Sequence, residues 1–283
     1  MSVIAEFSRQ IAALLPAIGN EEFPEQLIAS IKQLVALDEA SVIVYPGGGM
    51  PFIDYREPRE SWGHPNLDTF IKGAFVLDPY YLAATKDDRN GFFQLKELAP
   101  SGFKQSEYYR IYYRHSGLQD ECGYLIPTRG QGFINISLGR TTVSRAFRKA
   151  EVTLLADITP TIETLARQHW LPENAQEKSG SNLRKQLETA LDCFGSSVLT
   201  ERERQIMNMI LHGYATKTIA QQLKISIETV KLHRKNAYAK LDINMQSELF
   251  YLFIDSLMSS EGYSDGDPLQ MYLQSPLKSK VYK

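Results

Sequence analysis

Residues Leu199–Ile254 decide the fold of the C-terminal part of the chain; they read LTERERQIMNMILHGYATKTIAQQLKISIETVKLHRKNAYAKLDINMQSELFYLFI. Apolar spacing predicts four short helices, the third at about 227–241. One side of that helix is expected to pack inward through Val230, Ala237 and Leu241. Another side carries Lys231, Arg234, Lys235 and Tyr238. Four basic residues and one acidic residue give this helix a net charge of +3, whereas the whole chain has a net charge of −2. Positive charge is therefore concentrated on a surface that phosphates and base edges could approach.

The second and third helices are predicted to form a helix-turn-helix. The second is expected at 216–223, and residues 224–226 join it to the third. Two helices with a three-residue turn describe this motif. Ser226 is expected to cap the third helix by accepting from the N–H groups of its first turn.

Local signals set the ends of the remaining helices. Thr200 and Glu203 form a capping box in front of the first helix, and Gly213 fits its end. Asp242 and Asn244 break the chain before the fourth helix, whose apolar stripe is Leu249, Leu252 and Phe253. A helical bundle with a merely solvated basic face is the alternative. The agreement of caps, turn length, core spacing and cation placement argues against it.

Many positions of this stretch match a known pattern at fixed spacing: Leu199, Thr200, Arg202, Glu203, Gly213, Lys217, Ile219, Ala220, Leu223, Ile225, Ser226, Thr229, Val230, Lys231, His233, Asn236, Lys240 and Leu241. In these residues the stretch resembles the LuxR-type DNA-binding domain of bacterial transcription regulators. Two departures stand out. The family usually has Ser-Asn-Lys-Glu where this chain has Ala215–Thr218, so Thr216 is expected to cap the second helix. Met245 stands where the family commonly has an arginine.

The resemblance implies that the third helix reads double-stranded DNA. Lys231 and Lys235 are expected at base edges or adjacent phosphates, with Leu232 against a thymine methyl group. His233 falls in line with the inward stripe and is expected to pack there. Contacts with the phosphate backbone are expected from Thr216, Lys217, Thr229, Arg234 and Lys240.

The whole chain, with 283 residues of which 43% are hydrophobic, suits two domains. We expect an α+β ligand-sensing or regulatory domain at 1–170, followed by a linker with a short amphipathic helix at 171–198. The all-α, four-helix helix-turn-helix domain is expected at 199–258 and a polar tail at 259–283.

The first 170 residues alternate helical and extended patterns. Helices are predicted at 4–15, 23–37, 66–75, 79–84, 104–115 and 144–170, with Pro160 kinking or splitting the last. Strands are predicted at 41–45, 52–55, 92–95, 124–126 and 132–138. Hairpins with helices outside make a sensor-like α+β sandwich, similar to the PAS, GAF and signal-binding domains that precede LuxR-type readers.

Aromatic residues of this domain are candidates for an effector pocket, because ligand sites are mostly apolar with a few placed polar groups. Tyrosines four apart at 108–113 form two ridges; alternatively, one ridge belongs to the core and the other is partly exposed. An amine ligand could be held by aromatic faces and Asp78. The candidates are Trp62, Phe75, Asp78, Tyr80, Tyr81, Tyr109 and Tyr113.

Asp78-Pro79 allows two interpretations. It resembles the Asp-Pro step of LuxR-type acyl-homoserine-lactone receptors, in which the aspartate accepts from a ligand amide. Alternatively, Asp78 caps a helix that begins at Pro79, since proline suits the first helical position.

Sequence motifs of other functional classes are absent. Gly47–Gly49 is not followed by the Lys-Ser/Thr of a phosphate-binding loop, the five histidines are scattered, and no acidic residues follow the first strand as in a phosphorelay receiver. We therefore expect no enzyme, cofactor or metal. Neither a signal peptide nor a long apolar span is evident, and Cys122 and Cys193 suggest no disulfide framework, so a cytoplasmic protein without membrane association is expected.

The sequence thus predicts a transcription regulator controlled by a small molecule bound to the N-terminal domain. The alternative is a regulator whose N-terminal domain is a protein-interaction or dimerisation module with no small-molecule ligand. Expected partners are double-stranded DNA, a second copy of the chain, a small-molecule effector and RNA polymerase. The fourth helix could supply the dimer contact or pack on its own domain.

Overall fold

The computed structural model describes residues 3–47, 49–58, 70–71, 73–128, 132–171, 189–258 and 266–274. The chain forms two compact units. The first comprises Met1–Gly63, Leu82–Leu98 and Gly117–Ser181, and the second His64–Tyr81, Ala99–Ser116 and Asn182–Lys283. This division differs from the expected boundaries, because two N-terminal segments belong to the same unit as the helix-turn-helix. Trp62, most of the expected helix at 66–75 and most of the expected linker lie outside the described residues.

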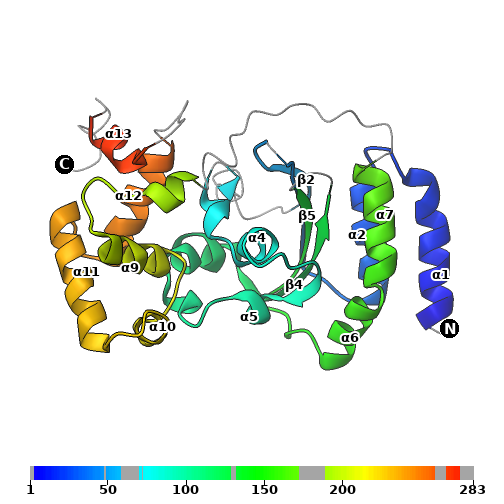
Figure 1. Ribbon diagram of the computed structural model, residues 1–283. Helices are drawn as coiled ribbons and strands as arrows, with labels where there is room; N and C mark the ends of the chain where they lie inside the picture. Colours follow the sequence, from blue (N-terminus) through cyan, green and yellow to red (C-terminus); the bar gives the residue numbers. More distant parts are fainter. Residues whose placement is uncertain are drawn as a thin grey trace. The chain divides into compact units, whose positions relative to one another are not determined.

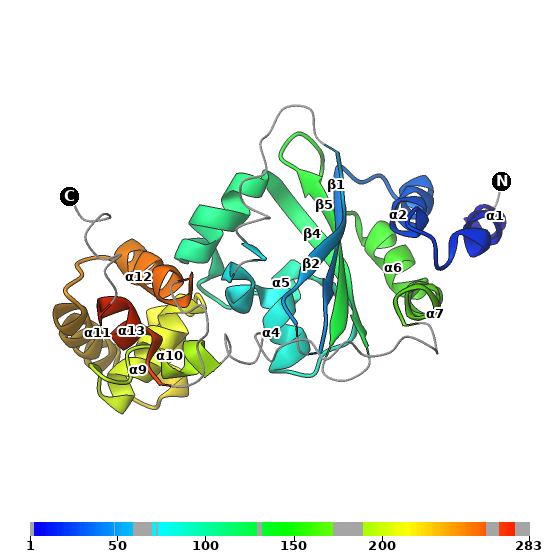
Figure 2. The same ribbon diagram turned by 90° about the horizontal axis from the view of Figure 1, so that it is seen from above.

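A five-stranded antiparallel sheet forms the first unit (Figures 1 and 2). The strands follow the order β2-β1-β5-β4-β3. Their bounds are β1 Glu39–Tyr45, β2 Phe52–Arg56, β3 Gly91–Gln94, β4 Leu118–Pro127 and β5 Phe133–Thr141. Each of the five strands predicted from the sequence is present, and β4 and β5 extend further than predicted because they pair along most of their length.

Helices cover one face of this sheet. Figure 2 shows α2, α6 and α7 against it and α1 outside α2. Their bounds are α1 Val3–Leu14, α2 Phe23–Leu34, α6 Lys149–Asp157 and α7 Thr159–Trp170, with a 3₁₀ turn at Leu15–Ala17. The expected split at Pro160 is confirmed: this proline lies in the first turn of α7, where its missing N–H costs no helical hydrogen bond.

Alternating residues of β1, β4 and β5 face these helices and form the core of the unit. Val42, Tyr124 and Ile136 are each fully buried there, and the Tyr124 hydroxyl donates to the Leu155 carbonyl of α6 at 2.8 Å. Two short helices complete the N-terminal part of the chain, α4 Pro79–Thr85 and α5 Leu95–Leu98.

Helices dominate the second unit. Its α-helices are α9 Glu201–Leu211, α10 Thr216–Gln222, α11 Ile227–Leu241, α12 Gln246–Met258 and α13 Pro268–Gln274, and Ala74–Leu77 forms a 3₁₀ turn. The expected regular helix at 104–115 is wrong in detail. Tyr109–Tyr113 form a π-helical turn between 3₁₀ turns at Phe103–Gln105 and Arg114–Ser116. Ser106 bonds to the backbone on both sides, accepting from Tyr109 N and donating to the Phe103 carbonyl, which favours a broken helix.

The caps predicted for the helix-turn-helix are confirmed with one exception. Thr200 and Glu203 bond reciprocally at the start of α9, and Ser226 accepts from Thr229 N at 3.0 Å at the start of α11. Gly213 has φ 84° after the C-cap of α9, a conformation that favours glycine. Thr216 does not cap α10. Ala215 holds the N-cap position without a side-chain bond, because the helix begins at Thr216, one residue earlier than a Thr216 cap requires.

The expected polar tail contains a helix. Asp267 caps α13 by accepting from Leu269 N at 3.0 Å, and Leu269 and Tyr272 are buried. Their spacing of three places both on one helical side. The apolar stripe of α12 is buried too, since Leu249, Leu252 and Phe253 are at most 6% exposed. Of the two roles considered for that stripe, packing on its own unit is the one observed.

Candidate nucleic-acid interface and effector site

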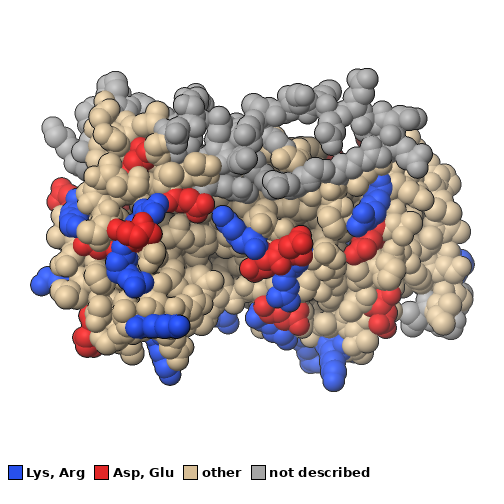
Figure 3. All heavy atoms as spheres, viewed as in Figure 1, with Lys and Arg blue, Asp and Glu red and all other residues tan. Residues whose placement is uncertain are grey.

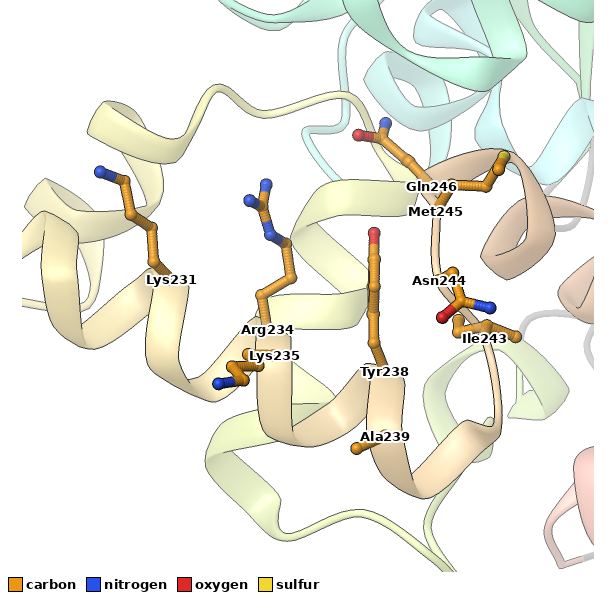
Figure 4. Close-up of a pocket in the computed structure, with 9 residues that line it drawn as sticks. All are labelled: Lys231, Arg234, Lys235, Tyr238, Ala239, Ile243, Asn244, Met245 and Gln246. Carbon is orange, nitrogen blue, oxygen red and sulfur yellow. The ribbon is translucent and has the colours of Figure 1, made fainter.

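One groove brings the predicted cationic side of α11 together. It is open, has a volume of about 540 Å³, and lies between α11 and the connection to α12. In Figure 4, Arg234 and Tyr238 extend in the same direction as Gln246, whereas Lys235 points away from them. The residues that line the groove are Lys231, Arg234, Lys235, Tyr238, Ala239, Ile243, Asn244, Met245 and Gln246.

Exposure differs along this groove. Lys231 and Lys235 are exposed, whereas Arg234 and Tyr238 are half-buried. Burial raises the pKa of the Tyr238 hydroxyl, so it stays protonated and can donate to a phosphate oxygen at neutral pH. Lys231 pairs with Glu228 at 2.9 Å, but both side chains are more than half exposed, so the pair is weak and exchangeable.

The apolar member of the predicted base-contact set faces solvent. Leu232 is 57% exposed. Val230, Ala237 and Leu241 point inward as expected and are at most 9% exposed. His233 is half-buried beside that inward stripe. The helix therefore presents cations and one aliphatic group together, as a reader of base edges requires.

Two predicted phosphate contacts lie at the start of α10. Lys217 is exposed and Thr216 is half-buried. Thr229, another member of the set, is half-buried at the start of α11, and its hydroxyl bonds to the Ser226 hydroxyl at 2.8 Å. Figure 3 shows basic side chains projecting at the α10 and α11 end of the unit, with acidic ones between them.

Lys240 is placed differently from the other cations. Its Nζ donates to Glu203 Oε2 at 2.7 Å, and the Glu203 side chain is only 5% exposed. Burial acts to raise the pKa of Glu203, but hydrogen bonds from Lys240 and Thr200 outweigh it and lower the pKa overall. The ammonium thus neutralises a buried carboxylate between α11 and α9, a structural role that sequence spacing did not indicate.

Sequence reasoning missed the far wall of the groove, Ile243–Gln246. Asp242 has φ 56° and ends α11 in a left-handed conformation, which turns the chain back along the helix. Asn244 N donates to Glu248 Oε2 at 2.6 Å and so fixes the start of α12. Asp242 and Asn244 could have indicated this turn in the sequence, because both residue types favour such a conformation.

Most effector candidates are core residues. Phe75, Tyr80 and Tyr81 are at most 1% exposed, and the rings of Phe75 and Tyr81 meet edge to face at 4.9 Å. Tyr109 and Tyr113 are half-buried, stacked at 5.5 Å and packed on Phe103. Tyr108 and Tyr112, by contrast, are buried. The two ridges thus divide as the alternative interpretation expected, one in the core and one partly exposed.

Asp78 caps a helix. Its Oδ1 accepts from Tyr80 N at 2.9 Å and Tyr81 N at 3.1 Å at the start of α4, and its Oδ2 accepts from the Tyr108 hydroxyl at 2.6 Å. Burial raises the pKa of this carboxyl, against the effect of those hydrogen bonds. The capping interpretation is confirmed, and both carboxyl oxygens are engaged within the protein.

The sheet face opposite α2, α6 and α7 is mostly apolar with a few polar groups. Ile43, Tyr45, Leu125 and Phe133 are buried there, and the rings of Tyr45 and Phe133 stack at 4.3 Å. Asn135 lies between Ile43 and Leu125 and is 6% exposed. Its Oδ1 accepts no hydrogen bond from any residue that the structure describes. An unsatisfied buried acceptor is costly unless something else bonds to it.

Two negative findings apply to the described residues alone. No three His, Cys, Asp or Glu side chains among them come together as a metal site would require. Within the same ranges, every helix is too short or too polar to cross a membrane.

Comparison with known proteins adds three findings. A family model described as "Bacterial regulatory proteins, luxR family" matches residues 197–253. An HTH-type transcriptional regulator from the exeN 3' region of Aeromonas salmonicida is 31% identical over 189 residues, which are 65% of this chain and 96% of the relative. The monoamine regulon transcriptional regulator of Klebsiella aerogenes is 43% identical over 53 residues, 19% of this chain and 23% of that protein.

Among solved structures, the VqsR LBD domain of Pseudomonas aeruginosa superposes with a TM-score of 0.50 at 24% identity. The match covers 58% of this chain and 95% of that domain. At 24% identity, this similarity shows a shared fold and nothing more specific.

Proposed function

The chain belongs to the luxR family of bacterial regulatory proteins, and from this premise we propose that a small-molecule effector controls its binding to specific DNA sites. The relatives are transcriptional regulators rather than enzymes. The single observation that carries the DNA contact is the α11 groove, in which three cations and a phenol line one surface. Such a surface suits phosphates and base edges.

We assign separate roles to the residues of this surface. Lys231, Lys235 and Leu232 read base edges and a thymine methyl group. Thr216, Lys217, Thr229 and Arg234 contact the phosphate backbone, with the Tyr238 hydroxyl as an added donor. Lys240 acts indirectly, by holding α11 against α9 through Glu203.

Recovery of bound DNA tests the proposed function. The full chain, immobilised and incubated with fragmented bacterial genomic DNA, should enrich discrete fragments that share a short sequence. If two copies bind as a dimer, this sequence should occur as two symmetric half-sites one or more helical turns apart. Recovery of fragments in proportion to their input would contradict sequence-specific binding.

The effector site is proposed at the sheet face that bears Asn135. Support comes from the unpartnered Asn135 acceptor within an apolar surface, and from a fold shared with a domain whose title calls it an LBD. A ligand of this site would be largely apolar and would carry a hydrogen-bond donor for Asn135 Oδ1.

A thermal-shift screen of the full chain against metabolites tests this part. A ligand that binds the folded state raises the melting temperature, and Asn135→Leu should abolish that shift. A shift that survives the substitution would place the ligand elsewhere. No shift from a broad library would favour the alternative, an N-terminal domain that binds another protein.

Three further properties remain part of the proposal. A homodimer is proposed because the single recognition helix of one helix-turn-helix covers only a short half-site of DNA. The cytoplasm is where such a regulator meets DNA, and RNA polymerase is the partner through which a bound regulator would alter transcription.

A further inference from the structure

A segment of the N-terminal half packs against the turn that leads into α10. The segment comprises residues 100–113, here called the docking segment. A methyl group added to Gly102 would lie 2.5 Å from the Gly213 carbonyl oxygen and 2.7 Å from Ala215 N. Such distances are too short for any side chain, so only glycine allows this approach. Backbone therefore meets backbone here.

The same segment reaches the first turn of α10. The hydroxyls of Ser101 and Thr218 are 2.7 Å apart and share a hydrogen bond. Thr216 and Lys217 lie between this contact and the contact at Gly213–Ala215. A DNA strand that approached Thr216 and Lys217 would therefore meet the docking segment.

A second part of the docking segment acts on α11. Glu107 is 7% exposed and bonds to Arg110 at 2.8 Å. Burial is the main cause of the raised pKa of Tyr238; the positive charge of Arg234 acts against it, and the negative charges of Glu107 and Glu248 add to it.

Internal contacts hold the docking segment in place. The Tyr108 hydroxyl donates to Asp78 at 2.6 Å, and the Tyr112 ring lies 5.9 Å from the Phe250 ring of α12. The segment is thus anchored to Asp78 at one point, to α12 at another and to the helix-turn-helix at a third.

We propose that the docking segment is an autoinhibitory element that competes with DNA for the surface formed by α10 and α11. This inference rests on the proposed function, since it requires that surface to bind DNA. Docked, the segment lies against Gly213–Ala215 and Thr218, which flank Thr216 and Lys217 in the sequence. DNA binding requires it to move away, so a signal that favours the undocked state raises DNA affinity.

A reversible cross-link tests the proposal on the full chain. Ser101→Cys combined with Thr218→Cys places two thiols where hydroxyls now lie 2.7 Å apart, close enough for a disulfide after a small adjustment. Oxidised protein should bind the selected genomic sites at least roughly tenfold more weakly than the same protein after reduction. Equal affinity in the oxidised and reduced states would overturn the proposal.

Controls separate this inference from the proposed function. Each single substitution should bind DNA equally well under oxidising and reducing conditions, because neither can form the cross-link. If the wild type and the reduced double variant bind no specific DNA, the proposed function itself fails. If both bind and oxidation changes nothing, only the autoinhibition fails.

A second variant acts in the opposite direction. Gly102→Ala forces the docking segment away from Gly213 and Ala215, and we expect it to raise DNA affinity by roughly threefold or more. Gly49→Ala is the matched control, because its added methyl would lie 3.6 Å from Pro46, an ordinary contact. Unchanged or lower affinity for Gly102→Ala, with an unchanged circular dichroism spectrum, would contradict the proposal.

Discussion

Glu203 and Lys240 illustrate how single residues join distant parts of the fold. Glu203 begins as a local capping residue, accepting from Thr200 N at 2.9 Å, and also receives the Lys240 ammonium from 37 positions along the chain. The cap could be predicted from the sequence because its partners lie three residues apart. The ion pair could not, because it depends on how α11 packs against α9.

Lys240→Ala should destabilise the second unit by about 3 kcal/mol, because it leaves the buried Glu203 carboxylate without its cation. Chemical denaturation monitored by circular dichroism measures this loss. Lys235→Ala removes an exposed cation of the same helix and should change stability by less than about 0.5 kcal/mol. If Lys240→Ala keeps wild-type stability but loses DNA affinity, Lys240 belongs among the phosphate contacts.

Glu151 gives the first unit a defined pH dependence. The Arg148 side chain, with the Arg148 backbone N–H and Arg140, lowers the Glu151 pKa from 4.5 to about 2. A lowered folded-state pKa stabilises the protein above the unfolded value, and that contribution is lost as pH falls from about 4.5 towards 2. Glu151→Gln should cost about 2 kcal/mol at pH 7 and almost nothing near pH 2.

Unfolding curves across this pH range test the Glu151 prediction. The exposed Glu21→Gln is the control and should stay close to wild type throughout. A Glu151→Gln deficit that persists unchanged at pH 2 would point to lost packing rather than lost charge.

At the scale of elements, helices set by local signals were predictable and those set by tertiary contacts were not. The bounds of α11 agree with the sequence prediction because Ser226 and Asp242 mark its ends within the chain itself. α13 was missed because it is short and its stability comes from Asp267. That carboxylate is 6% exposed and accepts from Gly195 N at 2.9 Å and Ser197 N at 2.8 Å.

Asp267→Ala should therefore lower the stability of the second unit by about 2 kcal/mol, since it strips acceptors from buried N–H groups as well as the cap of α13. Thermal unfolding of the full chain measures the effect. Asp242→Ala is the comparison: Asp242 is exposed, so its loss should cost no more than the preference of aspartate over alanine for the left-handed conformation. A wild-type melting temperature for Asp267→Ala would show that α13 contributes nothing to the unit.

At the scale of the whole molecule, the two compact units do not follow the chain order. Residues 64–81 and 99–116 belong with the helix-turn-helix, although their aromatic composition suggested a sensor domain. The sequence predicted the antiparallel sheet and the four reader helices because their periodicities are local. It could not predict which unit the intervening segments join, since glycine contacts such as Gly102 with Gly213 carry no periodic signal.

A fragment of residues 1–175 should consequently expose apolar surface that the full chain covers. It contains Tyr112, which is 9% exposed and packs on Phe250, but lacks α12. We expect the fragment to bind a hydrophobic dye such as ANS, while the full chain does not. A fragment without dye binding, and with a sharp thermal transition, would show that residues 99–116 fold independently of the reader.

The central claim is that α11 reads a DNA sequence, and the affinity ratio between two duplexes tests it most directly. Fluorescence anisotropy at one fixed salt concentration compares the full chain on a selected genomic site and on a scrambled duplex of equal length. The account predicts binding to the site that is tighter by about a thousandfold, with Lys235→Ala lowering that ratio by about tenfold or more. Equal affinities of the wild type for the two duplexes would contradict it.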